Sequence, residues 1–212
     1  MRLFLSSWRL DKRAQALSQL VGAGVRTAVV LNALDNLSDF PRAERLEEER
    51  RVLEMLGLPA FELDLRAYFG EHAALRTALH EVGLIWVTGG NVFVLREAIR
   101  RSGLEDFIGE LLCSEALAYG GYTAGACVAG PTLRGLEIVD DATAVNEPIW
   151  EGLGLVKCSI APHYRSHHPE SKSIEDVVGY FEAHRIPYRP LGDGQALVIS
   201  SGTSRVVEWA QA

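Results

Sequence analysis

Short apolar runs alternate with longer amphipathic segments along most of this chain, and this alternation limits the fold more than any other sequence feature. Buried strands are expected at 27–31 and 84–87, where apolar residues follow one another without polar interruption. Helices are expected around them at 41–56, 71–82 and 92–101. Strands separated by helices of this length predict an α/β fold, with a mostly parallel sheet that helices cover on both faces.

The remaining expected elements continue this pattern. Further strands are expected at 3–6, 60–65 and 155–161, and further helices at 11–21, 104–117 and 170–184. Near the end of the chain, 196–199 and 205–209 read as two strands of a hairpin that are joined by a turn. The irregular stretch 131–154 is expected to be a loop or a small hairpin close to the functional site.

Length and charge narrow the class of protein. The 212 residues suit a single α/β domain over 1–212, and the net charge of −7 argues against binding to nucleic acid or to anionic membranes. No apolar run approaches the ~18 residues of a membrane-spanning helix, and the short apolar start is not a secretory signal, so a cytoplasmic location is expected. The three cysteines have no regular spacing and indicate neither a disulfide framework nor a zinc site.

The segment Gly121-Tyr122-Thr123-Ala124-Gly125 has the layout of a nucleophile elbow, with threonine where serine is usual. A sharp turn between a strand and a helix presents the central hydroxyl, and the flanking residues are small because the two backbones approach closely. Thr123 is therefore the candidate nucleophile for acyl transfer. The alternative is a tight strand-to-helix connection without chemistry. A third alternative is Cys127 as the nucleophile. It is disfavoured because Cys127 lies one helical turn later, where its thiol is expected to face the packed helix.

Two further segments at expected strand ends fit the same chemistry. Gly89 and Gly90 can offer a backbone N–H to an oxyanion hole, together with the N–H of Ala124. Asn91 comes next and is a candidate for substrate binding, although it can also simply cap the following helix. His163 follows another expected strand, and imidazole is the commonest base for a hydroxyl nucleophile.

The loop beyond His163 contains candidates for other roles. His167 and His168 form a pair, but no carboxylate or cysteine stands at regular ligand spacing, so neither a metal nor a cofactor is expected. An acidic substrate needs a cationic partner, for which Arg165 is the first candidate and Lys172 and Arg134 are others. Each of these three can equally be an ordinary surface charge.

Several motifs occur in the order seen in the peptidase E family of aspartyl dipeptidases. They are Thr-Gly-Gly-Asn at 88–91, Gly-Tyr-Thr-Ala-Gly-Ala at 121–126, Gly-Pro-Thr at 130–132, Pro-His-Tyr at 162–164, His-Pro-Glu-Ser at 168–171 and Asp-Gly-Gln-Ala-Leu-Val at 193–198. The chain resembles this family strongly from about residue 84 to 207, and by layout before that. The family is related to cyanophycinases and, more distantly, to class I glutamine amidotransferases. The resemblance implies a flavodoxin-like fold.

The resemblance also implies a serine-type hydrolase. In that family the elbow serine attacks a peptide carbonyl, a histidine accepts its proton, and the favoured substrates have an acidic N-terminal residue. Carried over to this chain, Thr123 stands at the nucleophile position and His163 is the base. The family places its acid in the loop after the elbow helix, which corresponds here to Glu137, with Asp140 or Asp141 as alternatives.

Thr123 departs from the family pattern Ser-Ala-Gly. A β-branched residue is poorly suited to the strained backbone of an elbow, where strain costs about 1–3 kcal/mol. Two functions are therefore weighed: hydrolysis of small peptides, including those with N-terminal aspartate, and a catalytically silent homologue that binds a ligand or partner. A glutamine amidotransferase activity is disfavoured because no cysteine occupies the elbow. The expected partner is a small peptide substrate. A homodimer is a further possibility.

Overall fold

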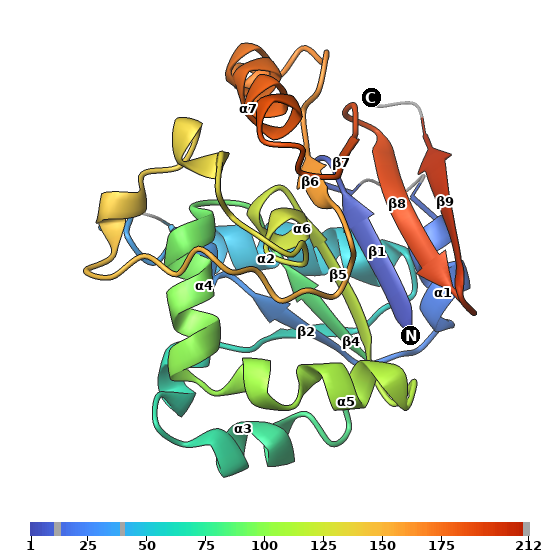
Figure 1. The fold of residues 1–212 in the computed structure, drawn as a ribbon. Coiled ribbons are helices and arrows are strands. Elements are labelled where there is room, and N and C mark those ends of the chain that lie inside the picture. Colours follow the sequence, from blue (N-terminus) through green and yellow to red (C-terminus); the bar gives the residue numbers. More distant parts are fainter. Residues whose placement is uncertain (11–13, 39–40, 210–212) are drawn as a thin grey trace.

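The structure is a computed structural model that describes residues 1–10, 14–38 and 41–209. Within these residues a seven-stranded sheet runs through the molecule in the order β3-β2-β4-β5-β1-β8-β9 (Figure 1). The first five strands in this order are parallel, and β8 and β9 are antiparallel to their neighbours. The strands are β1 (Arg2–Ser6), β2 (Thr27–Val30), β3 (Ala60–Glu62), β4 (Leu84–Val87), β5 (Ala118–Tyr122), β8 (Gln195–Ser200) and β9 (Thr203–Glu208).

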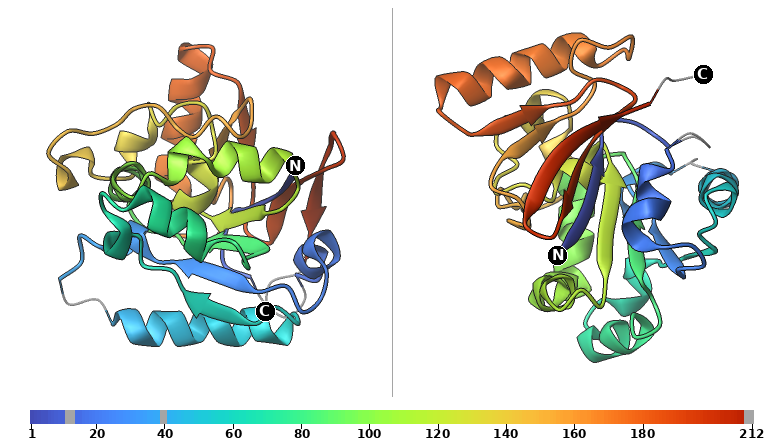
Figure 2. Two further views of the ribbon diagram at one scale, coloured as in Figure 1. Left: turned by 90° about the horizontal axis from the view of Figure 1, so that it is seen from below. Right: turned by 90° about the vertical axis from the view of Figure 1, so that its right-hand side faces the viewer.

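Helices cover both faces of the sheet, as the sequence predicts. Figure 2 shows α2 on one face and α4 and α5 on the other. The helices are α1 (Ala16–Val21), α2 (Arg42–Met55), α3 (His72–Ala78), α4 (Val92–Arg101), α5 (Ile108–Cys113), α6 (Ala124–Cys127) and α7 (Ser171–Ala183). No helix in the described ranges is both long and apolar enough to cross a membrane.

Two hydrophobic clusters form the core, one on each side of the sheet. Successive strand residues point to opposite faces, so Ile85 joins one cluster and Trp86 joins the other. Leu53 of α2 packs in the cluster with Trp86, whereas Phe93 of α4 packs in the cluster with Ile85. The core strands β2, β4 and β5 are buried along their whole length, which explains their continuous apolar sequence.

Register places several loops at one edge of the sheet. Ser6 pairs with Tyr122, and Val87 pairs with Gly121, so β1, β4 and β5 end side by side. Ser7, Thr88 and Thr123 follow directly on these ends. On the other side of β1, Ala196 pairs with Ser6, which brings the start of β8 to the same edge.

Some expected elements differ from those observed. The strand expected at 155–161 is only β6 (Ser159–Ala161), and it pairs with β7 (Tyr188–Pro190) in a separate small sheet. The helix expected at 104–117 is broken at Phe107, whose φ of −135° is not helical, so only a short 3₁₀ turn and α5 form. The expected strand 60–65 ends at Glu62, because Asp64 caps a 3₁₀ turn. Of the expected helix 11–21, residues 11–13 lie outside the described part.

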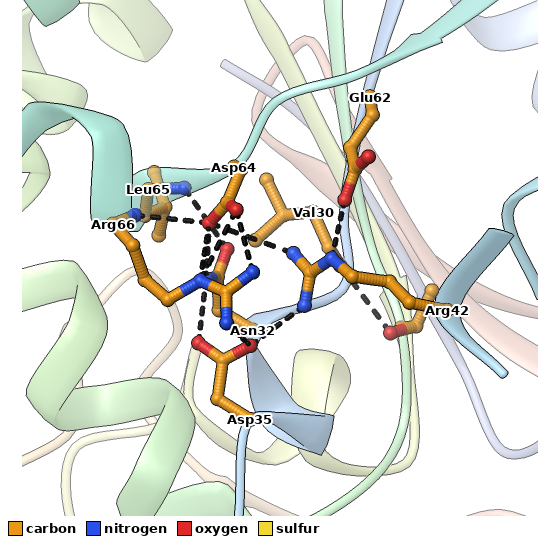
Figure 3. A network of polar contacts seen from close by, with 9 residues as sticks. Val30, Asn32, Asp35, Arg42, Glu62, Asp64, Leu65 and Arg66 are labelled. Carbon is orange, nitrogen blue, oxygen red and sulfur yellow. Dashed lines mark hydrogen bonds and ion pairs between the residues drawn. The ribbon is translucent and has the colours of Figure 1, made fainter. Parts of the chain in front are cut away.

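A network of polar side chains joins the ends of β2 and β3 to the start of α2 (Figure 3). Arg42 donates hydrogen bonds to Asp35 and Glu62 and lies 3.5 Å from Asp64. Burial opposes ionisation of Asp64, but hydrogen bonds donated by Arg66 and by Asn32 outweigh it and hold its pKa below the usual range.

We expect Arg42→Ala to lower the free energy of unfolding at pH 7 by about 1–3 kcal/mol, because three carboxylates would lose a shared cation. Urea denaturation measures this loss. Because the pKa of Asp64 is lower in the folded protein than in the unfolded chain, its ionisation stabilises the fold above pH 3.8, and this contribution is lost as the pH falls. The difference in unfolding free energy between wild type and Arg42→Ala should therefore shrink below pH 3.8. Arg51→Ala, at an exposed position of the same helix, is the matched control. Equal losses in both variants would contradict a role for the network.

Candidate active site

The elbow has the backbone that its sequence predicts. Thr123 lies between β5 and α6 with φ 49° and ψ −113°, a conformation that is rare and strained for a β-branched residue. A Cβ on Gly125 would overlap the carbonyl oxygen of Val87, and one on Gly121 would approach that oxygen to 2.7 Å. Glycine is therefore required at both flanking positions for β4, β5 and α6 to meet this closely.

Thr123 and His163 are brought together. The Oγ1 of Thr123 lies 3.2 Å from Nε2 of His163, within hydrogen-bond distance. His163 is fully buried after the end of β6, and its Nδ1 lies 2.7 Å from an Oδ1 of Asp193. With the proton on Nδ1 facing the carboxylate, Nε2 is free to accept the proton of the hydroxyl.

The carboxylate bound to His163 corrects our expectation. It belongs to Asp193, in the loop before β8, and not to Glu137, Asp140 or Asp141. Each of these three is bonded instead to a backbone N–H elsewhere: Glu137 to that of Gly135, Asp140 to that of Val92 and Asp141 to that of Thr143. These bonds hold the three carboxylates in the 135–143 loop and at the start of α4, away from Nδ1.

Asp193 is kept ionised by its neighbours. Burial raises the pKa of its carboxyl group, but the hydrogen bond and charge of His163, with the hydroxyls of Ser166 and Ser7, lower it below its usual value overall. In the sequence Asp193 stands out only as the first residue of the Asp-Gly-Gln-Ala-Leu-Val motif at 193–198, to which no catalytic role is assigned. Its approach to His163 depends on the antiparallel pairing of β8 with β1, which no local pattern reveals.

Ser7 contacts all three groups, and the sequence analysis did not single it out. Its fully buried hydroxyl accepts a hydrogen bond from the backbone N–H of His163 (2.7 Å) and donates one to Oδ1 of Asp193 (3.0 Å). Its carbonyl oxygen lies 3.2 Å from Oγ1 of Thr123 and accepts from that hydroxyl. One residue at the end of β1 thus holds the hydroxyl, the imidazole and the carboxylate in register.

Loss of the Ser7 hydroxyl should lower the stability of the fold. In Ser7→Ala the buried N–H of His163 loses its acceptor, and we expect the free energy of unfolding to fall by about 1–3 kcal/mol. Chemical denaturation would show the change. Ser114→Ala removes an exposed hydroxyl bonded to a backbone carbonyl and should alter stability by less than about 0.5 kcal/mol. A Ser7 variant as stable as the Ser114 variant would mean that these bonds contribute little.

The predicted oxyanion donors lie beside the hydroxyl. In the described part of the chain, the backbone N–H groups of Gly89, Gly90 and Ala124 have no acceptor. A Cβ on Gly89 would lie 3.0 Å from Cβ and 3.2 Å from Oγ1 of Thr123, so the backbone of Gly89 passes directly against the threonine side chain. Backbone N–H groups beside a nucleophile are what an oxyanion hole requires, and Gly90 lines the same cleft as Gly89 and Thr123.

The two predicted substrate-binding residues lie differently. The buried Asn91 accepts hydrogen bonds from the N–H groups of Phe93 and Val94, and donates to the carbonyl of Asp141. This is the helix-capping role that the sequence also allowed. Arg165 is exposed, stacks on Tyr164 and lines a neighbouring hollow.

A cleft of about 210 Å³ opens beside Thr123. Its walls carry charges of both signs: the cations Arg9 and Arg45, and the carboxylates Asp140 and Glu170. Sequence analysis did not predict the two arginines, because they lie far along the chain from the elbow. Arg165 lines another hollow, so the arginines that line this cleft are Arg9 and Arg45.

Two histidines and a tryptophan pack at the edge of the cleft. The rings of His163 and His168 are stacked, with centroids 3.7 Å apart and an angle of 13°, and Trp8 packs against both. Together with Glu170, the histidines offer ligand atoms within 4.8 Å of one another, close enough to hold a metal. Because the rings are nearly parallel, their in-plane lone pairs do not converge on one point, so this geometry favours ring packing.

Fold and site together define an α/β protein of the class I glutamine amidotransferase-like fold, with a hydroxyl, a buried histidine and a carboxylate at the edge of its sheet. The chain belongs to peptidase family S51, whose sequence model matches residues 38–207. The resemblance to peptidase E is confirmed.

Individual relatives agree with this assignment. An uncharacterized peptidase of Listeria monocytogenes is 31% identical over 156 residues, which is 73% of each chain. A probable alpha-aspartyl dipeptidase of Drosophila melanogaster is 34% identical over 128 residues, covering 57% of this chain and 51% of its own length. The crystal structure of a putative peptidase E from L. monocytogenes has the same fold, with a TM-score of 0.81, 24% identity and coverage of 99% of this chain and 98% of its own.

Proposed function

We propose that this member of family S51 is a dipeptidase that uses Thr123 as its nucleophile. The observation that carries the proposal is the row of three groups in which Oγ1 of Thr123 lies 3.2 Å from His163, and His163 lies 2.7 Å from Asp193. A hydroxyl, an imidazole and an ionised carboxylate in this order are the groups that acyl transfer requires.

The proposed reaction follows from these contacts. Nε2 of His163 takes the proton of Thr123 as Oγ1 attacks the peptide carbonyl, and Asp193 stabilises the imidazolium that forms. The free N–H groups of Gly89 and Ala124 bind the developing oxyanion. The imidazolium then gives its proton to the leaving amine, and water, activated by the same histidine, releases the acyl group from Oγ1.

The β-branch of Thr123 is compatible with this role. A branched side chain has few χ1 rotamers, and here Oγ1 lies within hydrogen-bond distance of both His163 and the carbonyl of Ser7. The imidazole proposed to take the proton is therefore already within reach of Oγ1. Its proton has two acceptors in the resting protein, and transfer to the histidine requires that the contact to Ser7 be given up.

The proposed substrates are small peptides with an acidic N-terminal residue. The cleft is small, and Arg9 and Arg45 line it. Both arginines are paired with Glu48, at 3.5 and 3.0 Å, which positions their guanidinium groups beside the cleft. The relative from Drosophila bears the name of an alpha-aspartyl dipeptidase, in line with this choice.

A second candidate function is that of a silent homologue that binds a ligand without turnover. One observation favours it: the hydroxyl of Thr123 also donates toward the carbonyl of Ser7, on a backbone that is strained for threonine.

Substitutions at position 123 separate the two functions. Assays of aspartyl dipeptides and aspartyl p-nitroanilide should show an active wild type, a Thr123→Ser variant of at least similar activity, and a loss of about a thousandfold or more in Thr123→Ala. Thr203→Ala, in the exposed turn of the β8–β9 hairpin, is the control. If wild type matches Thr123→Ala and only serine restores turnover, the chain is the silent homologue. Equal activity in all variants would remove Thr123 from the mechanism.

A further inference from the structure

The charges in the cleft come from elements on opposite faces of the sheet. Arg45 lies on α2, which packs in one hydrophobic cluster, while Asp140 lies beside α4 and α6, which pack in the other. Glu170 lies at the start of α7, and α7 also packs in the second cluster. The cleft thus has a cationic wall and an anionic wall, with Thr123 lining it between the two faces.

The carboxylate of Asp140 is only half bonded. Its Oδ2 accepts a hydrogen bond from the N–H of Val92 at 2.9 Å, whereas Oδ1 accepts none from residues 1–10, 14–38 or 41–209. The groups that act on it most closely are this N–H at the start of α4, the carboxylate of Glu170 and the buried thiol of Cys127, while Arg9, Arg45 and His168 line the same cleft. The N–H, the carboxylate and the thiol are not cations.

We propose that Asp140, with Glu170, binds the α-ammonium group of the peptide's N-terminal residue. In a peptide this nitrogen is only two bonds from the carbonyl carbon that Thr123 attacks, so its acceptor must line the same cleft, as Asp140 does. A cation between the two carboxylates would relieve their repulsion and use the open Oδ1. The inference rests on the proposed function. An ammonium site would explain why the enzyme cleaves after the N-terminal residue of a peptide.

Electrostatics at Asp140 agree with this assignment. The pKa of its carboxyl group is raised to about 7, because burial and the nearby charge of Glu170, which raise it, outweigh the N–H of Val92, which lowers it. A bound cation beside this carboxyl group would favour its ionised form and lower its pKa. Perturbed groups of this kind in a cleft are typical of functional sites.

Helix capping alone does not account for Asp140. Asn91 already bonds the N–H groups of Phe93 and Val94 at the start of α4. The bond to Val92 needs only an oxygen acceptor, which an asparagine amide also supplies. Asp140→Asn therefore removes the charge and keeps the cap.

Kinetics with free and blocked amines test the proposal. For aspartyl p-nitroanilide, Asp140→Asn should lower kcat/KM about tenfold to a hundredfold, mainly by raising KM, because a charged contact is lost. For the N-acetylated substrate the variant should equal the wild type. Asp141→Asn, in the same loop with its carboxylate bonded to Thr143, should leave both substrates unchanged. Equal losses for both substrates in Asp140→Asn, or no loss for either, would overturn the proposal.

Binding distinguishes a failure of this inference from a failure of the proposed function. In a Thr123→Ala background, calorimetry should show that aspartyl-alanine binds, that N-acetyl-aspartyl-alanine binds at least tenfold more weakly, and that Asp140→Asn removes the difference. At pH 7, binding of the free dipeptide should also release protons, detected with buffers of different ionisation enthalpy, and Asp140→Asn should not. This pattern would hold even if wild type hydrolyses nothing. Equal affinity for both dipeptides, or binding of neither, would refute the ammonium site.

Discussion

The close packing of the Val87 carbonyl against Gly121 and Gly125 is the contact on which the rest of the site depends. Because no side chain separates β4, β5 and α6 there, the chain can turn within one residue and leave Thr123 with a positive φ. The same closeness brings the backbone of Gly89 against the threonine side chain. The Cα of Thr123 and the N–H groups around it are therefore positioned by backbone geometry.

A buried acid, Glu49, connects α2 to the sheet. Glu49 accepts hydrogen bonds from the indole of Trp86 and the hydroxyl of Tyr122. Burial raises the pKa of Glu49, while these two bonds and the charges of Arg9 and Arg45 lower it, with a net rise. The two arginines thus act on the charge of Glu49 and are paired with Glu48. This framework gives the cationic wall a fixed place relative to the residue that precedes Thr123.

The features that can be predicted from the sequence are those that depend on residues close together in the chain. The alternation of strands and helices, the elbow and the glycines after β4 are written in short segments, and the structure has them where the sequence predicts them. His163 is predictable because a histidine follows directly on the end of an expected strand. Asp193 and Ser7 are not, because their roles arise when β8 pairs with β1, two segments nearly two hundred residues apart. The family pattern directed attention to Glu137, whose carboxylate instead binds the N–H of Gly135.

The ring of Trp8 touches the imidazoles of both His163 and His168, with centroid distances of 5.1 and 4.7 Å. An indole in van der Waals contact with an imidazole loses fluorescence when that imidazole gains a proton. Trp8 is therefore an internal optical probe of the charge on His163 and His168 together, without an added label. Light emitted by one side chain should follow the charge of its neighbour in real time, whatever molecule occupies the cleft.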